Sequence, residues 1–373
     1  MKTPVSTNRS AVDRRSFMKS GLMAGGAATV GAGLLSNANV ARAQERAEGG
    51  RLNRGDTAIL RFLAAAELIE ADLWTQYAEL GGLTSGVPIE VNPNQTLNAY
   101  QTALSQLDSD GPQYITSNTL DEVSHAVFLN AYLKSKGEEK VDFEKFLLPL
   151  GSTATGSSVR NRLTNLTHLN VDTSWYVRYR STTNPDFGAT FPQAITLNDV
   201  TAIPITDADF KNMDHIQVIA NTAGFHFGAI EQGGTSLYAT LSQKVTHPEV
   251  LKITLSIGGD EIAHFLEWVD FAGNGVQPPV APVTDPESGL TIPNFFDPLN
   301  KLIQPSLIFP APCEFISPDL PKVAIIRPTS DEFSGAVAAI QGFIASGLFT
   351  GQSQEFLDVL QEMAFDADQA FRR

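Results

Sequence analysis

The sequence predicts a mainly α-helical protein: a four-helix bundle, with a β-hairpin-containing insertion between its second and third helices and a C-terminal extension. Three observations support this prediction. Apolar residues recur at helical spacing in four long segments. A pattern of Glu, Tyr, Asp and His residues occurs twice, once in each half of the chain. Between the two copies lies a segment rich in Val, Thr, Trp, Tyr and Ile, which is typical of strands.

Residues 1–43 are predicted to be an export signal of the twin-arginine kind. Arg14-Arg15 and the nearby Phe17 resemble the twin-arginine motif, a Gly/Ala-rich stretch follows, and Ala41-Arg42-Ala43 fits a cleavage site. Because this route exports folded proteins, it suits a protein that receives its cofactor in the cytoplasm. We therefore expect a periplasmic or extracellular protein. No later run of about 18 apolar residues occurs, so no membrane insertion is expected after cleavage.

Residues 55–140 are expected to form the first two bundle helices. The first begins with Asp56 as its N-cap and continues through the apolar positions of residues 59–80. The second is expected at residues 117–136, after a short helix at residues 97–107.

Residues 141–206 are expected to be an insertion in the crossover between the second and third bundle helices. Residues 143–150 resemble a short helix. Residues 169–180 and 194–205 are predicted to pair as a β-hairpin, because they are rich in β-branched and aromatic residues and are separated by turn signals.

Residues 207–272 are expected to hold the other two bundle helices. One lies within residues 207–241, and the other starts at His247-Pro248, where Pro suits the first helical position. Residues 273–373 are predicted to be a Pro-rich strap followed by two amphipathic helices that close the chain. The strap is expected to be ordered, because a flexible linker would not carry so many large apolar residues.

The repeated pattern is the strongest functional signal in the chain. Its first copy is Glu70, Tyr77 seven residues later, and then the segment Asp121-Glu122-Val123-Ser124-His125. Its second copy is Glu231, Tyr238 seven residues later, and then the segment Asp260-Glu261-Ile262-Ala263-His264. Each copy supplies one lone Glu and one Glu-x-x-His, whose two side chains share a helix face.

Four carboxylates and two imidazoles from four helices are a typical ligand set for two metal ions. Two cations a few ångströms apart repel each other, so several anionic oxygens are needed to hold them, and each imidazole adds a softer nitrogen. We therefore predict a binuclear centre with six ligands: Glu70, Glu122, His125, Glu231, Glu261 and His264. Glu67, one turn before Glu70, is a rival ligand. Glu70 is preferred because only Glu70 is followed by a Tyr at the spacing found after Glu231.

This layout resembles the ferritin-like superfamily over roughly residues 57–136 and 207–271. The similarity is to exported ferritin-like proteins, a group that also includes plant desiccation-related proteins. The resemblance implies that Asp121 and Asp260 hydrogen-bond the His ligand of the partner helix, and that Tyr77 and Tyr238 hydrogen-bond ligating carboxylates. It also implies a cofactor of two iron ions, or alternatively two manganese ions, in a protein that oxidises Fe(II) or turns over O₂ or hydrogen peroxide.

A non-catalytic bundle is the alternative function. Such a protein would sequester metal ions, or act as a stress-related or desiccation-related structural protein. In the weakest form of this alternative, the repeated residues are a buried polar network that remains from an ancestral metal site.

Composition argues against several other functions. The chain has a formal charge of −15, and the residues after position 43 carry 20 basic and 40 acidic side chains, so nucleic-acid binding is not expected. The single cysteine excludes a rubredoxin-type site. The insertion and the long C-terminal extension disfavour a ferritin storage cage, while the oligomeric state stays open.

Overall fold

The computed structural model describes residues 51–83, 90–158, 161–178, 192–276, 280–295, 317, 319–324 and 334–371. This part of the chain is mainly helical, as predicted, and each of its two small sheets has two strands. No helix among these residues is long and apolar enough to cross a membrane. The predicted export signal and most of the predicted Pro-rich strap lie outside the described residues.

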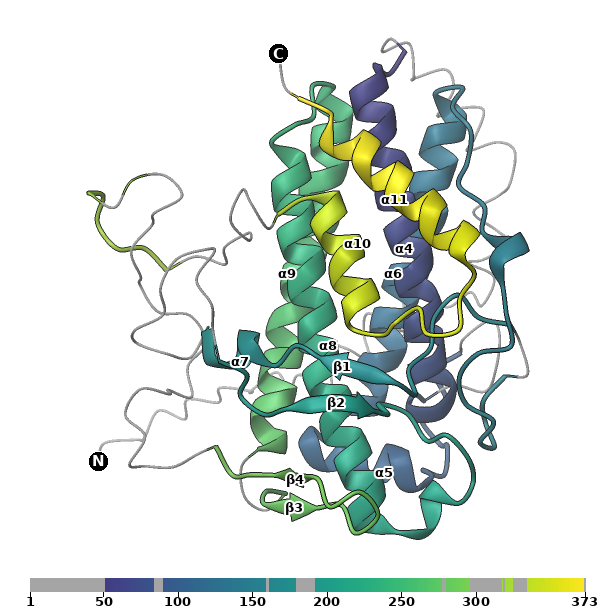
Figure 1. The fold of residues 1–373 in the computed structure, drawn as a ribbon, viewed down its shortest axis with the longest axis vertical. Helices are drawn as coiled ribbons and strands as arrows, with labels where there is room; N and C mark the ends of the chain where they lie inside the picture. The colour runs from purple at the N-terminus through teal and green to yellow at the C-terminus, as the bar shows by residue number, and fades with distance from the viewer. Residues whose placement is uncertain are drawn as a thin grey trace, which may run out of the picture. The chain divides into compact units, whose positions relative to one another are not determined.

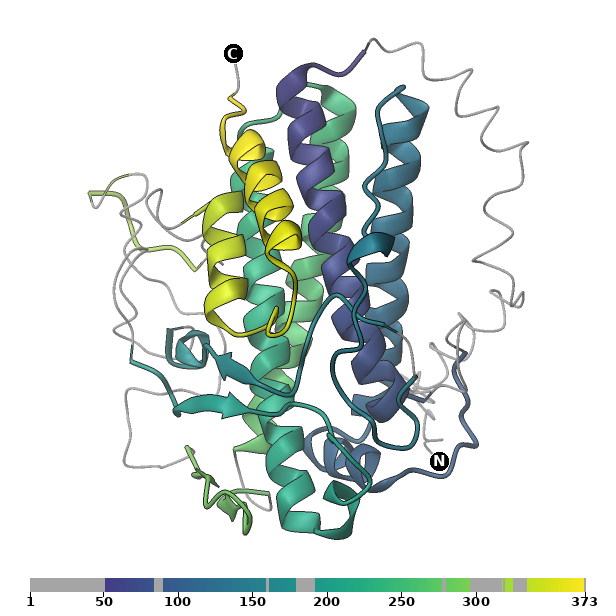
Figure 2. The same cartoon turned by 45° about the vertical axis from the view of Figure 1, so that its right-hand side comes forward.

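Four long helices run side by side (Figures 1 and 2). They are α4 (Arg54–Gly81), α6 (Gly111–Ser135), α8 (Met213–Ser242) and α9 (Pro248–Gly275). Large aromatic side chains join three of them: the Trp74 ring of α4 stacks on Phe227 of α8 and on Trp268 of α9, with centroid distances of 5.0 and 5.3 Å. All three rings are fully buried. Burying one such side chain contributes about 1.5–3 kcal/mol.

Contacts at the helix ends fix the direction of each helix. Asp56, near the start of α4, accepts a hydrogen bond from the backbone N–H of His247, which precedes α9, so α4 and α9 start at the same end. Tyr132, near the end of α6, donates to Glu249 in the first turn of α9 at 2.9 Å. α6 therefore runs opposite to α9, and so does α8, which a short loop joins to α9. Because α6 and α8 are parallel, the chain must cross the length of the bundle between them.

Two helix starts differ from the sequence prediction. Asn53 is the N-cap of α4, and its side chain accepts a hydrogen bond from the backbone N–H of Asp56. The prediction of Asp56 as the cap was wrong, because its carboxylate instead holds the loop before α9. α6 begins at Gly111 rather than near residue 117, and Pro112 suits its first turn. The start of α9 at His247-Pro248 is confirmed.

The insertion contains a strand pair but is not a simple hairpin. β1 (Leu169–Val171) and β2 (Leu197–Val200) pair in an antiparallel manner. Between them, helix α7 (Ser174–Arg178) replaces the end of the first predicted strand. The predicted short helix at residues 143–150 is reduced to the 3₁₀ turn η1 (Glu144–Phe146).

Trp175 explains why α7 is not a strand. Its indole is fully buried, and its Nε1 donates to the backbone carbonyl of Phe225 in α8 at 3.1 Å. At Gly228 of α8, an added Cβ would lie 2.4 Å from the Trp175 ring, so the indole lies directly on the helix backbone. This tertiary contact overrides the strand propensity of the local sequence.

The remaining elements cover the bundle. They are α5 (Ala99–Leu107), η2 (Asp209–Lys211), β3 (Val283–Thr284), β4 (Thr291–Ile292), α10 (Ala336–Ala345) and α11 (Gln354–Asp368). α10 and α11, yellow in Figure 1, pack against α8 and α4. α5 confirms the helix predicted at residues 97–107, and α10 and α11 confirm the two helices predicted at the end of the chain.

Candidate metal centre

Acidic and histidine side chains from all four long helices meet inside the bundle. None of them is more than 8% exposed. They are Glu67 and Glu70 of α4, Glu122 and His125 of α6, Glu231 of α8, and Glu261 and His264 of α9.

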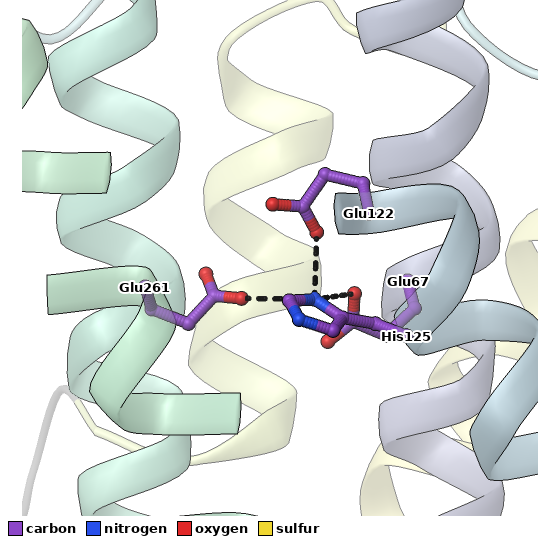
Figure 3. A group of neighbouring side chains, drawn as sticks. All are labelled: Glu67, Glu122, His125 and Glu261. Carbon is purple, nitrogen blue, oxygen red and sulfur yellow. Dashed lines mark hydrogen bonds and ion pairs between the residues drawn. The ribbon is translucent and has the colours of Figure 1, made fainter. Parts of the chain in front are cut away.

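The first cluster surrounds His125 (Figure 3). Its Nδ1 lies 3.3 Å from Glu67 Oε2, 3.3 Å from Glu122 Oε2 and 3.8 Å from Glu261 Oε1. One ligand atom from each of these four residues lies within 4.8 Å of the others. They are therefore close enough to surround one metal ion.

The second cluster surrounds His264. Its Nδ1 lies 3.0 Å from Glu122 Oε1 and 3.4 Å from Glu231 Oε2, and these three residues again offer ligand atoms within 4.8 Å of one another. Glu122 thus belongs to both clusters, with Oε2 facing one imidazole and Oε1 facing the other. A carboxylate in this position can bridge two metal ions.

The outer nitrogen of each imidazole faces an aspartate. His125 Nε2 lies 3.1 Å from Asp260 Oδ2 of α9, and His264 Nε2 lies 3.4 Å from Asp121 Oδ2 of α6. The two Asp side chains are 43% and 48% exposed, so they connect the buried rings to the surface. An aspartate at Nε2 holds the proton there and leaves Nδ1 as the nitrogen that can bind a metal.

The two tyrosines have different partners. The hydroxyl of Tyr238 donates to Glu67 Oε1, so this tyrosine binds a carboxylate of the centre. The hydroxyl of Tyr77 lies 2.6 Å from His226 Nδ1. Burial lowers the pKa of His226 to about 3, so its ring is neutral and its Nδ1 accepts the tyrosine proton. His226 lies five residues before Glu231 and off its helix face, so spacing gave no signal for this contact.

Glu67 is brought into contact with His125, whereas Glu70 belongs to neither cluster. Glu70 nevertheless faces the same centre, because it is buried and the charges of Glu122, Glu67 and Glu231 raise its pKa further. A signal for Glu67 was present in the sequence: residues three apart share a helix face. Spacing alone could not decide which of the two carboxylates reaches the imidazole.

Protons balance much of the negative charge of these carboxylates. Burial raises the pKa of Glu67 to about 8 and that of Glu231 to about 7. Burial, with the charge of Glu122, raises the pKa values of Glu70 and Glu261 well above the ordinary range. At neutral pH, several of these groups are therefore carboxylic acids, and a metal ion would have to displace their protons.

Glu122 and the two imidazoles form the charged part of the centre. Burial alone would raise the pKa of Glu122, but hydrogen bonds from His125 and His264 outweigh it and lower the pKa to about 2. Burial alone would lower the pKa of His125, but hydrogen bonds to Asp260, Glu122 and Glu67 outweigh it and raise the pKa to about 12. Against the same burial, the charge of Glu231 and hydrogen bonds to Asp121 and Glu122 hold the pKa of His264 far above its usual range.

Several buried carboxylate oxygens without hydrogen bonds indicate whether the centre fits metal ions. Both carboxylate oxygens of Glu231 and both of Glu261 are buried without a hydrogen bond of acceptable geometry among the residues described. Buried polar atoms without hydrogen bonds are costly, and a cation that displaced the protons of these carboxyl groups would satisfy their oxygens. The donor set, which is rich in carboxylate and has two imidazoles, fits iron or manganese.

Gly234 makes room for one of these carboxylates. A Cβ at this position of α8 would lie 1.9 Å from Glu261 Oε2, which is far closer than two nonbonded atoms can approach. Glu261 can therefore lie against the α8 backbone only because residue 234 has no side chain.

No protein-family model matches the chain, and neither a curated protein nor a solved structure matches it. The chemistry of the centre therefore rests on its own side chains. Its buried clusters of Glu, Asp and His could hold a metal ion.

Proposed function

We propose that this chain is an exported ferritin-like protein that holds two metal ions, iron in the first instance, in an oxidoreductase-type centre. The observation that carries this proposal is the position of Glu122. Its two oxygens face two imidazoles, at 3.3 and 3.0 Å, that come from different helices. A binuclear centre needs a carboxylate shared between two nitrogen donors. A site for a single metal ion does not need one.

The topology supports the ferritin-like part of the proposal. Ferritin-like folds have four long helices with one long crossover. Here α6 and α8 are parallel, so the chain must cross the length of the bundle between the end of α6 and the start of α8. The pairing of each imidazole with an Asp from the opposite helix pair supports it as well.

Each residue of the centre has a role in this proposal. Glu67, Glu122, Glu261 and His125 would hold one ion, and Glu122, Glu231 and His264 the other, with Glu70 beside them. Bound iron or manganese supplies redox chemistry with O₂ or hydrogen peroxide. The protein residues hold the Nε2 protons at Asp121 and Asp260 and exclude bulk water. Because every proposed ligand is buried, the centre would suit a small substrate such as Fe(II), O₂ or hydrogen peroxide.

Elemental analysis of the exported protein tests the proposal. The mature chain should be purified without chelators or added metal and is expected to hold about two iron or manganese ions per chain. Ferrous-oxidation and peroxide assays should then show turnover. His125→Ala combined with His264→Ala should remove the metal and leave the helical content unchanged by circular dichroism. No metal after anaerobic Fe(II) reconstitution would refute the proposal.

Metal sequestration is the second candidate, and the burial of the whole ligand set favours it. A fully enclosed centre can keep ions from reacting as readily as it can activate them. Two tightly held ions per chain without ferrous-oxidation or peroxide activity would select this non-catalytic function.

A further inference from the structure

The two halves of the bundle carry matching residues at fixed offsets in residue number, one offset for α4 and α8 and another for α6 and α9. Glu231 lies 161 positions after Glu70, and Tyr238 lies 161 positions after Tyr77. The ligands of α6 and α9 are related in the same way, with an offset of 139 positions. If this symmetry were complete, the two metal positions would be equivalent.

Glu67 breaks the symmetry. The residue 161 positions after it is Gly228. A Cβ at Gly228 would lie 2.4 Å from the ring of Trp175, so the indole from the insertion fills the space where a side chain would begin. The α8 half of the centre therefore cannot offer a carboxylate that matches Glu67.

The carboxylates are accordingly divided unevenly between the two imidazoles. Oxygens of Glu67, Glu122 and Glu261 lie within 3.8 Å of His125 Nδ1. Among the residues described, the second cluster has only two carboxylates. Its His264 Nδ1 lies 3.0 Å from an oxygen of Glu122 and 3.4 Å from an oxygen of Glu231.

Tyr238 adds to this difference. It donates to Glu67 Oε1 and thereby fixes the carboxylate with Oε2 towards His125. Its counterpart Tyr77 is bound to His226 and orients no carboxylate of the second cluster.

We infer that the two metal positions are unequal: the position at His125 fills first and holds its ion more tightly than the position at His264, and Glu67 causes the difference. Once a metal ion has displaced their protons, three carboxylates in a buried centre attract a divalent cation more strongly than two do, and the number of charged ligands sets cation affinity. This inference rests on the proposed binuclear function.

Anaerobic titration of the metal-free mature protein with Mn(II) tests the inference. Calorimetry should resolve two steps, the first at least about tenfold tighter than the second. Electron paramagnetic resonance should show an isolated Mn(II) signal up to the first equivalent and a coupled pair only as the second is added. Neither readout depends on catalytic activity.

Three variants assign the steps. Glu67→Gln keeps the size of the side chain and can still accept the Tyr238 hydrogen bond, and it should weaken the first step at least about tenfold. His125→Ala should remove the tight step. The matched variant His264→Ala should remove only the weak step. Circular dichroism of each metal-free variant checks that the helices are intact.

Two results would overturn the inference and leave the proposed function standing. One is uptake of two Mn(II) ions by the wild-type protein with equal affinity or in a single cooperative step. The other is an unchanged first step in Glu67→Gln. If the wild-type protein binds neither Mn(II) nor Fe(II), the proposed function fails and the inference fails with it.

Discussion

At the scale of single residues, two neighbouring glycines of α8 have different surroundings. Gly234 lies under the Glu261 carboxylate, where a Cβ would come within 1.9 Å of Oε2. At Gly233 an added Cβ would meet no atom within 4 Å. The pair therefore separates the general effect of a helical glycine from the specific need for space at the centre.

Gly234→Ala should weaken metal binding at least about tenfold, because the methyl group displaces the carboxylate of Glu261, a proposed ligand. Gly233→Ala is the matched control and should bind metal normally. It should also gain about 0.5–1 kcal/mol of stability, since alanine loses less conformational entropy in a helix. Metal titration and urea denaturation of both variants measure these effects. Equal metal affinity in the two variants would show that Glu261 is not a ligand.

At the scale of elements, one side chain anchors the insertion to the bundle. Trp175 of α7 is fully buried on the backbone of α8 at Gly228, and its Nε1 is hydrogen-bonded to Phe225. Its ring lies 6.0 Å from that of Phe265 in α9, so the insertion contacts two of the long helices through one residue.

Trp175→Ala should lower the free energy of unfolding by about 3–5 kcal/mol, because it leaves a large cavity and removes the hydrogen bond from Nε1 to the Phe225 carbonyl. Trp175→Phe should lose less, since a ring still fills most of the space. Urea denaturation monitored by circular dichroism measures both. A loss below about 1 kcal/mol for Trp175→Ala would contradict the packing at Gly228.

At the scale of the whole molecule, the buried carboxyls make the stability of the metal-free protein depend on pH. Folded-state pKa values of about 8 for Glu67 and about 7 for Glu231 lie above their value of about 4.3 in the unfolded chain. Between these values the native state binds more protons than the unfolded state. The raised pKa values of His125 and His264 act in the same direction, because their contribution is complete only below about pH 6.5.

The metal-free protein should therefore lose at least about 2 kcal/mol of stability between about pH 5 and pH 8. Bound metal should reverse this trend, because the ions take the place of protons that are scarce at high pH. Urea denaturation of chelator-treated and metal-loaded protein across this range measures both. If the metal-free protein were more stable near pH 8 than near pH 5, the pKa values of the buried Glu and His residues would not be raised as described.

The predicted export signal can be tested in the full-length chain. Arg14→Lys combined with Arg15→Lys should leave the precursor in the cytoplasm if the twin-arginine route is used. Arg9→Lys is the matched control outside the motif and should be exported normally. Cell fractionation and immunoblotting of both variants give the answer, and normal export of the double variant would point to another route.

The amino-acid sequence was sufficient to predict the helical character of the chain and much of the order of its helices. The helix start at His247-Pro248 is set by residues within one turn, so it could be predicted directly. The repeated Glu-x-x-His likewise needed only helical spacing to place its Glu and His side chains on one face.

Features that depend on contacts with a neighbouring helix could not be predicted from the sequence. Glu67 and Glu70 share a face of α4, and the packing of α4 against α6 selects Glu67 for contact with His125. Asp56 could have capped its own helix, but the loop before α9 offers it two backbone N–H groups. Ser174–Arg178 has the composition of a strand, and burial of its Trp on α8 makes it a helix. In each case the local sequence is compatible with two conformations or partners, and a contact with a distant residue selects one.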